Sequence, residues 1–447
     1  MIRTLRIDPE LAHAGRPIQG LGVQADPPPF LFRHTTQLNE ADLDEITAHA
    51  ERRLTLLRPG IARLFCFPEL TNTDRLVRMV RFLDTLGCGV NLTLLTAGHT
   101  PRAQLPALAE RVVDFVAELR AANGCRSVCW LTLGNEPETQ FPHDSPLTRE
   151  IFGADRVTQR ALDWADYVNF NRAALARLAT RGLANDVRLV VVDAAWGGQM
   201  RRERMALGAA AFPTEPVGFS YHHYNPEDPA FYRGAPPAFA YQGMAEEAAR
   251  FRRLVGDREL VIWEFNNAGK GFGTHEPGTN ARGENVIDAV EAGAELSWKV
   301  ITALAHGVDG LCLWHMHDSD VNHFGLWRWR EGQYRCKPIW FYYAALCRLF
   351  QPGQIVVPVT GGDSSVAAVA TRAATGECRL AVVNCAPTPT GVWVELPVAA
   401  DWQQQRIAPP GLAERDETQV THGTPVTSAE FELAPWELVT FSSSSRR

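Results

Sequence analysis

VCWLTLGNEP, residues 128–137, is a short apolar run that ends in Asn135, Glu136 and Pro137. A second run, LVIWEFN at residues 260–266, carries Glu264 after four apolar residues. Runs of this length, rich in Val, Ile, Leu and Trp, are typical of strands that are buried on both faces of a parallel sheet. Because an unpaired carboxylate is costly to bury, folding alone does not favour a glutamate at either position.

Similar apolar runs recur along the first 350 residues and alternate with amphipathic stretches, which is the pattern of repeated strand–helix units. Strands are predicted at residues 18–24, 61–67, 89–95, 128–133, 188–193, 217–221, 260–263 and 310–314. Helices are predicted at residues 40–57, 73–86, 105–122, 162–179, 244–254 and 285–306. Eight strands with helices between them predict a (β/α)8 TIM barrel over residues 10–350.

Polar residues and glycines mark the expected ends of these helices. Asp42, Asp74 and Asn285 are predicted N-terminal caps, because their side-chain oxygens can accept hydrogen bonds from first-turn N–H groups. Gly87 and Gly307 are predicted C-terminal stops.

Beyond residue 350 the helical period disappears, and strand-like runs are separated by Gly, Pro, Asp and Thr turns. Strands are predicted at residues 354–359, 365–371, 379–384, 391–396, 427–433 and 437–442. This pattern predicts a small C-terminal antiparallel β-sandwich over residues 351–447. The alternating segment 2–7 lies outside the barrel, and residues 1–9 are expected to add an edge strand to the sandwich.

The composition argues against several classes of protein. The net charge of -7, with 44 Lys and Arg scattered along 447 residues, argues against a nucleic-acid partner. No apolar run approaches the length that crosses a membrane. The nine cysteines include no Cys-x-x-Cys pair, and the first residues lack the apolar segment of a signal peptide. The sequence therefore predicts a cytoplasmic protein without a disulfide framework, although it leaves secretion open.

The two glutamates are expected to meet at one end of the barrel. Glu136 ends the fourth predicted strand and Glu264 follows the seventh, and the C-terminal strand ends carry the chemistry in such barrels. A pair of carboxyl groups there is the apparatus of glycosidic bond cleavage. The competing interpretation of Glu136 is a residue that caps the following helix.

At these positions the sequence resembles clan A of the glycoside hydrolases, which are retaining enzymes on a (β/α)8 barrel. The resemblance covers about residues 18–345 and rests on acidic residues after strands four and seven, with Asn135 before the first of them. The layout of barrel and sandwich is similar to that of families 30 and 39. The resemblance implies that Glu136 is the general acid and base and that Glu264 is the nucleophile.

Further residues match the pattern of the clan. Arg63, late in the second predicted strand, matches the arginine that holds the nucleophile ionised; the alternative is a salt bridge at the base of the barrel. His222 and Tyr224 match residues that orient the nucleophile and the sugar. Trp314 matches the tryptophan that forms the floor of the subsite, and Asn135 is expected to bind a sugar hydroxyl.

The predicted function is that of a retaining β-glycosidase that hydrolyses β-linked oligosaccharides by double displacement, with carboxyl groups about 5–5.5 Å apart. An alternative in the same clan is an endo-acting β-glucanase or xylanase that cleaves polysaccharides. Two alternatives of other classes are a non-catalytic carbohydrate-binding barrel and a metal-dependent hydrolase that uses His315, His317 and His323. The leading prediction includes a carbohydrate substrate, no cofactor and no metal, and the sequence does not indicate the oligomeric state.

Overall fold

The computed structural model describes the greater part of the chain. The described residues are 2–7, 16–26, 39–66, 73–95, 100–146, 148–149, 162–195, 197–224, 237–267, 279, 283–318, 323–328, 335–362, 365–395, 401–409, 412, 416, 418, 424–426 and 430–444.

Parallel strands close into a barrel in chain order, which confirms the predicted (β/α)8 architecture. The barrel strands are β2 (Gly20–Gln24), β3 (Ile61–Cys66), β4 (Gly89–Leu94), β5 (Val128–Thr132), β6 (Arg188–Ala194), β7 (Gly218–His223), β8 (Leu260–Phe265) and β9 (Gly310–Leu313). β7 and β8 continue two residues beyond their predicted ends, so His222 and Glu264 lie within strands and not after them.

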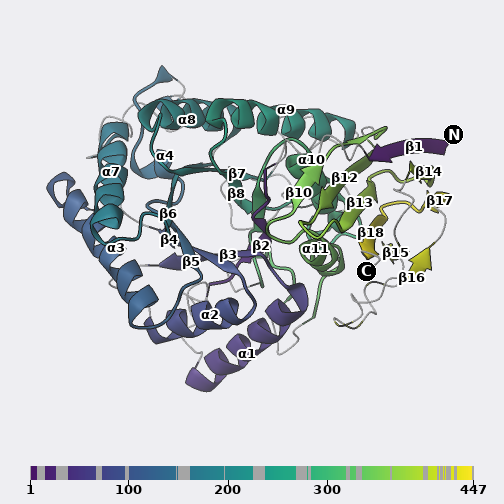
Figure 1. Ribbon diagram of the computed structural model, residues 1–447, viewed down its shortest axis with the longest axis horizontal. Helices are drawn as coiled ribbons and strands as arrows, with labels where there is room; N and C mark the ends of the chain where they lie inside the picture. Colours follow the sequence, from purple (N-terminus) through teal and green to yellow (C-terminus); the bar gives the residue numbers. More distant parts are fainter. Residues whose placement is uncertain are drawn as a thin grey trace.

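Helices surround the barrel, as Figure 1 shows. They are α1 (Glu40–Leu57), α2 (Thr73–Thr85), α3 (Leu105–Ala121), α4 (Pro137–Gln140), α7 (Trp164–Thr180), α8 (Gly197–Ala211), α9 (Pro237–Val255), α10 (Ala292–Ala305) and α11 (Pro338–Leu349). The six predicted helices are confirmed, whereas α4, α8 and α11 were not predicted. α11 is apolar on almost every side and therefore lacks the amphipathic period that identifies a surface helix. Among the described helices, none has the length and hydropathy needed to cross a bilayer.

The N-terminal caps differ from the prediction. α1 begins with a capping box, in which Asn39 Oδ1 accepts the Asp42 N–H and Asp42 Oδ2 accepts the Asn39 N–H, both at 3.0 Å. The prediction of Asp42 as the cap was therefore wrong, because Asp42 is the third helical residue of the box. Asp74 likewise lies inside the first turn of α2.

The start of α10 was also predicted too early. Asn285 Oδ1 accepts the Ile287 N–H at 2.9 Å and organises a turn, while α10 itself begins at Ala292. The predicted C-terminal stops are confirmed: Gly87 and Gly307 have φ angles of 69° and 92°, a left-handed conformation that glycine adopts without a steric penalty.

The remaining strands form two sheets, which confirms the predicted sandwich. One sheet has the order β11-β1-β14-β17 and the other the order β10-β12-β13-β18-β15-β16. The strands are β1 (Ile2–Ile7), β10 (Ile355–Val357), β11 (Val359–Thr360), β12 (Val366–Arg372), β13 (Cys378–Asn384), β14 (Thr390–Glu395), β15 (Asp401–Ile407), β16 (Thr424–Val426), β17 (Glu430–Leu433) and β18 (Leu438–Ser444). β15 was not predicted, because its sequence DWQQQRI carries three consecutive glutamines in place of alternating apolar residues.

The prediction of an edge strand at the N-terminus was wrong in its position. β1 lies inside its sheet, between β11 and β14, and it pairs with β14 in parallel. Leu5 and Ile7 point into the core between the two sheets, where they join Val392 and Val394 of β14. The first residues of the chain are therefore an internal part of the sandwich.

Two helices join the sandwich to the barrel. α10 and α11 lie beside the six-stranded sheet in Figure 1, and residues of β12 and β13, such as Val369 and Val383, belong to the same hydrophobic core as the barrel helices. The Tyr342 hydroxyl of α11 donates to the Trp436 carbonyl at 2.6 Å. The sandwich thus supports one side of the barrel.

The barrel interior is packed, and its open end lies at the carboxyl ends of the strands. The interior cluster consists of Ile61, Trp130, Val190, Val261, Trp263 and Cys312.

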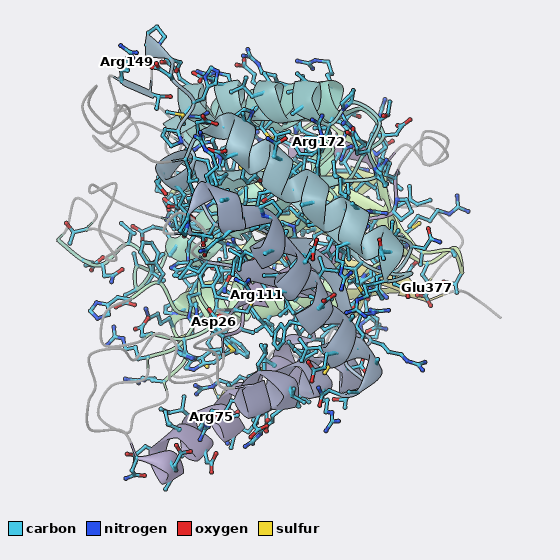
Figure 2. All side chains as sticks on the ribbon, turned by 90° about the vertical axis from the view of Figure 1, so that its left-hand side faces the viewer. Asp26, Arg75, Arg111, Arg149, Arg172 and Glu377 are labelled. Atoms are coloured by element: carbon cyan, nitrogen blue, oxygen red, sulfur yellow. The ribbon has the colours of Figure 1, made fainter. Side chains whose placement is uncertain are left out.

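Asp26, which follows β2, lies toward the left of Figure 2, whereas Glu377 in the β12–β13 turn lies toward the right. That turn of the sandwich is therefore far from the mouth of the barrel.

Leu5 tests whether β1 contributes to the core between the two sheets. Because Leu5 is fully buried, Leu5→Ala is expected to lower the free energy of unfolding by about 2–5 kcal/mol, whereas Thr4→Ala on the exposed face is expected to change it by about 0.5 kcal/mol or less. Urea denaturation of both variants measures this difference. Equal effects of the two substitutions would contradict the burial of Leu5 between the two sheets.

Candidate active site

Arg63, in the middle of β3, is fully buried and donates to acceptors from four other strands or strand ends. Its Nη1 donates to Glu264 Oε2 at 2.8 Å, and its Nε donates to Thr93 Oγ1 at 3.0 Å. Its Nη2 donates to Asp193 Oδ2 at 2.6 Å and to Asn135 Oδ1 at 2.7 Å. Burial opposes the charge, but Asp193 and Glu264 outweigh it and raise the pKa of Arg63. Arg63 therefore lies at the mouth of the barrel and not in a salt bridge at its base.

Glu264 is buried within β8 and is held by donors from neighbouring strands. The register of β7 with β8 shifts between Ser220 and His222, where β8 has one extra residue, so that His222 pairs with Glu264. The Tyr224 hydroxyl donates to Glu264 Oε1 at 2.5 Å, while Arg63 holds Oε2. Burial raises the pKa of Glu264 above its ordinary value, and His222 and Arg63 only partly offset this.

Glu136 lies beside Glu264 in a more open environment. It follows β5 and occupies the N-cap position of α4, but its side chain makes no capping hydrogen bond. One oxygen of Glu136 lies within 4.8 Å of one oxygen of Glu264. The Glu136 side chain is 29% exposed and that of Glu264 is 8% exposed. The mouth thus brings together one buried and one solvent-accessible carboxyl group.

His222 lies between the acidic groups of the site. Its Nδ1 is 3.4 Å from Glu136 Oε1 and 3.7 Å from Glu264 Oε1, and its Nε2 is 3.3 Å from Asp193 Oδ1. Burial disfavours a charge on this ring, but Glu264 and Asp193 outweigh it and raise the pKa of His222 to about 10. His222 is therefore a cation at neutral pH.

Asp193, at the end of β6, is a site residue whose role the sequence did not identify. It is fully buried, accepts from Arg63, and accepts the Ser220 hydroxyl at 2.6 Å. Burial would raise its pKa, but Arg63 and His222 outweigh burial and lower the pKa of Asp193 to about 2. Its signal in the sequence was the same as that of the two glutamates, an acid at the end of an apolar run.

The backbone at these strand ends has an unusual conformation. Glu136, Val192 and Asp193 have φ angles of 50°, 80° and 44°, in the left-handed region that costs non-glycine residues on the order of 1–3 kcal/mol. The register of β6 with β7 shifts between Val192 and Ala194, and the Val192 N–H donates to the Tyr167 hydroxyl at 2.9 Å. This local distortion turns Asp193 toward Arg63 and His222.

Glu138 is a second acid close to Glu136. It is fully buried in α4, and its Oε1 accepts the Ala195 N–H at 2.5 Å, which ties α4 to the end of β6. Burial and the charge of Glu136 raise the pKa of Glu138 to about 7, and Arg204 offsets this only partly. Glu138 therefore supports the segment that carries Glu136.

Trp314 follows β9 and is partly buried at the mouth. Its ring lies 5.6 Å from the ring of Phe65, and the Phe65 ring in turn lies 4.8 Å from the Arg63 guanidinium. The Asn266 amide donates to the Trp314 carbonyl. The structure thus brings the predicted catalytic and sugar-binding residues to the same end of the barrel. These are Arg63, Asn135, Glu136, His222, Tyr224, Glu264 and Trp314.

The rings of His315 and His317, which follow β9, lie against backbone carbonyls. His315 Nδ1 lies 2.9 Å from the His317 carbonyl, and His317 Nδ1 lies 3.0 Å from the Asp318 carbonyl. Burial lowers the pKa of His317 to about 3. Lys337 Nζ donates to Asp318 Oδ1 at 2.8 Å and to the His323 carbonyl at 3.0 Å. These contacts organise the segment after β9.

Within the part of the chain that the structure describes, one group of three side chains could offer ligand atoms to a metal. It consists of Glu136, His222 and Glu264, and not of the histidines after β9. A histidine must lose its proton before it can ligate a metal, so a metal bound here would compete with the proton of His222.

The fold is shared with solved glycoside hydrolases. The catalytic domain of GH30 xylanase C from Talaromyces cellulolyticus has a TM-score of 0.66 and 13% sequence identity, over 99% of this chain and 100% of that chain. The GH51 arabinofuranosidase from Xanthomonas axonopodis pv. citri has a TM-score of 0.64 and 13% identity, over 99% of this chain and 100% of that chain.

A further neighbour is described only as a conserved exported protein from Bacteroides fragilis, with a TM-score of 0.67 and 9% identity over 98% of this chain and 100% of that one. Comparison with models of protein families and with curated sequences gives no match. At these identities the likeness establishes the fold, and it agrees with the resemblance of the sequence to clan A.

His223 lies next to His222 in β7 but on the opposite face of the strand, and its pKa shifts in the opposite direction. Its Nδ1 lies 3.2 Å from Glu247 Oε2, and burial lowers the pKa of His223 to about 4 despite that carboxylate. The two neighbouring histidines are therefore held in opposite charge states.

The two histidines are expected to give opposite pH dependences of stability. The raised pKa of His222 stabilises the fold fully at pH values below about 6.5, the pKa of histidine in the unfolded chain, and this stabilisation is lost as the pH rises through about 10. The difference in melting temperature between wild type and His222→Asn should therefore narrow from pH 6.5 to 10. For His223→Asn the difference should narrow as the pH falls from 6.5 to 4. Melting curves across this range measure both trends, and parallel trends would contradict the assigned charge states.

Proposed function

We propose that this protein is a retaining β-glycosidase in which Glu264 is the nucleophile and Glu136 is the general acid and base. The observation that carries the proposal is the pairing of these carboxyl groups at the mouth, with one oxygen of each within 4.8 Å. Retaining enzymes need about 5–5.5 Å between the two carboxyl groups, whereas inverting enzymes need about 6.5–9.5 Å to admit a water molecule.

The surroundings of Glu264 suit a nucleophile. A nucleophilic carboxylate must be ionised and oriented, and Glu264 accepts from Arg63 on one oxygen and from Tyr224 on the other. The positive charge of His222 lies 3.7 Å away and favours the carboxylate form. These contacts partly offset the effect of burial, which favours the neutral acid.

The surroundings of Glu136 suit a group that exchanges protons. Its side chain is 29% exposed, so it can deliver a proton to a leaving group and take one from a water molecule at the same place. The short distance between one oxygen of Glu136 and one of Glu264 is compatible with both carboxyl groups acting on one anomeric centre.

The reaction then proceeds in two displacements. Glu264 attacks the anomeric carbon and forms an ester bond, the glycosidic C–O bond breaks, and the proton of Glu136 passes to the leaving oxygen. In the second step Glu136 takes a proton from water, the water oxygen bonds to the anomeric carbon, and the ester bond to Glu264 breaks. The carboxylate that leaves returns to the donors Arg63 and Tyr224.

The substrate is proposed to be a β-linked oligosaccharide. The resemblance to clan A implies an equatorial linkage or its arabinofuranoside equivalent, and the solved neighbours include xylanases and an arabinofuranosidase. The Trp314 ring offers an apolar face for a sugar ring. Asn135 uses its Oδ1 to accept from Arg63, which orients the amide nitrogen for a sugar hydroxyl. Endo-acting cleavage of a β-glucan or xylan is the alternative, which product analysis separates from exo action.

Substitution of each carboxyl group should have a distinct kinetic effect. Glu136→Gln should lower kcat/KM on unactivated β-glycosides by about 10²–10⁴-fold, and much less on aryl glycosides whose leaving group needs no proton. Glu264→Gln should lose several orders of magnitude on both substrate types, because no covalent intermediate can form. Steady-state kinetics on matched substrates measure this, with Glu259→Gln as a control that alters a buried glutamate bound to Trp130 and Arg188.

The decisive experiment is mass spectrometry after incubation with 2-fluoro glycosyl inactivators of the xylosyl, glucosyl, galactosyl and arabinofuranosyl types. A covalent adduct mapped to Glu264 is expected, and the sugar that reacts identifies the glycon. If no inactivator labels the protein and Glu264→Gln remains as active as wild type, Glu264 is not the nucleophile. Activity that is lost with a chelator and restored by a metal would favour the metal-dependent alternative.

A further inference from the structure

Lys299 is a buried lysine that contacts the residues just beyond the ends of β7 and β8. It belongs to α10, which packs beside the barrel, and only 3% of it is exposed. Burial lowers its pKa, and the attraction of Glu295, one helical turn earlier, only partly offsets this. A buried ammonium is costly compared with an apolar side chain of similar size, so the packing of a helix on a barrel does not by itself favour lysine here.

The amino group of Lys299 bridges the two chain segments just beyond the end of the β7–β8 ladder. The ladder of β7 and β8 ends at the pair of His223 and Phe265. Tyr224 follows β7 and Asn266 follows β8. Lys299 Nζ donates to the backbone carbonyl of each of them. The contact with Asn266 is 2.9 Å long. A single side chain therefore replaces the next rung of the sheet.

Both residues that Lys299 contacts lie close to Glu264, the proposed nucleophile. The Tyr224 hydroxyl donates to Glu264 Oε1 at 2.5 Å, so a shift of the Tyr224 backbone would move the donor away from the carboxylate. Asn266 follows Glu264 by two residues, and its amide donates to the carbonyls of Trp314 and Phe324. Lys299 is thus the common support of the Tyr224 donor and of the link between β8 and Trp314.

We propose that Lys299 is a positioning residue that aligns the Tyr224 hydroxyl with Glu264 by holding the ends of β7 and β8 together. This inference rests on the proposed function, because it assumes that Glu264 is the nucleophile. It assigns to α10 a role in the formation of the covalent intermediate, beyond its packing against the sandwich.

The test compares Lys299→Met with Lys299→Arg, and uses Ser297→Ala as the control. Arginine can donate to both carbonyls, whereas methionine preserves length and apolar volume but donates to neither. Ser297 is buried on the same helix, and its hydroxyl donates only to the Gly293 carbonyl, within α10. Lys299→Gln, which keeps an uncharged donor, replaces Lys299→Met if the latter does not fold.

The readouts are the rate at which the 2-fluoro inactivator labels Glu264, and the acidic limb of the pH profile of kcat/KM. Lys299→Met should slow labelling by about 10²-fold, the scale expected for a misplacement of about 1 Å. Its acidic limb should move to higher pH, because a displaced Tyr224 hydroxyl no longer stabilises the carboxylate of Glu264. Lys299→Arg should recover most of the rate, and Ser297→Ala should match wild type in both readouts.

A double-mutant cycle with Tyr224→Phe isolates the pathway. If Lys299 acts through Tyr224, Lys299→Met should cost much less in the Tyr224→Phe background than in wild type. Equal costs in both backgrounds, or a lower melting temperature of Lys299→Met without a change in labelling rate or acidic limb, would overturn the inference. Failure to label wild type at Glu264 would instead overturn the proposed function.

Discussion

The charge balance around Arg63 is the constraint on which the rest of the site depends. Two buried cations, Arg63 and His222, face two buried carboxylates, Asp193 and Glu264, with the shortest of these contacts at 2.6 Å. Removal of one member of such a group leaves an unpaired buried charge, at a cost of about 3–5 kcal/mol. Glu136 lies at the rim of this balanced group, where water can reach it. The site therefore separates a buried carboxyl group that is held by hydrogen bonds from one that water can reach.

This arrangement requires strand ends that depart from regular pairing. The register shifts between β6 and β7, between β7 and β8, and between β8 and β9, in the sector that carries Asp193, His222 and Glu264. Such bulges re-aim individual side chains without changing the order of the strands. The distorted strand ends are then secured from outside the sheet, by the Tyr167 hydroxyl at Val192 and by neighbouring helices.

The sandwich contributes to the same sector of the barrel. The chain begins in the sandwich with β1, forms the barrel, and returns to the sandwich after α11, so both ends of the barrel segment are fixed in one structure. α10 lies between this sandwich and β8 and carries Lys299 on its barrel side and Ala294 beside Cys385. The packing of the sandwich thus bears on the helix whose Lys299 contacts the end of the strand that carries Glu264.

The barrel, the sandwich and the strand-end positions of Glu136 and Glu264 could be predicted from the sequence, because apolar periodicity and acids at strand ends are local patterns. The internal place of β1 could not, since sheet order depends on pairing between distant segments. The tertiary structure also revealed the role of Asp193 and the charge of His222. Those properties arise from distances to groups on other strands and from burial, and neither quantity is written in the local sequence.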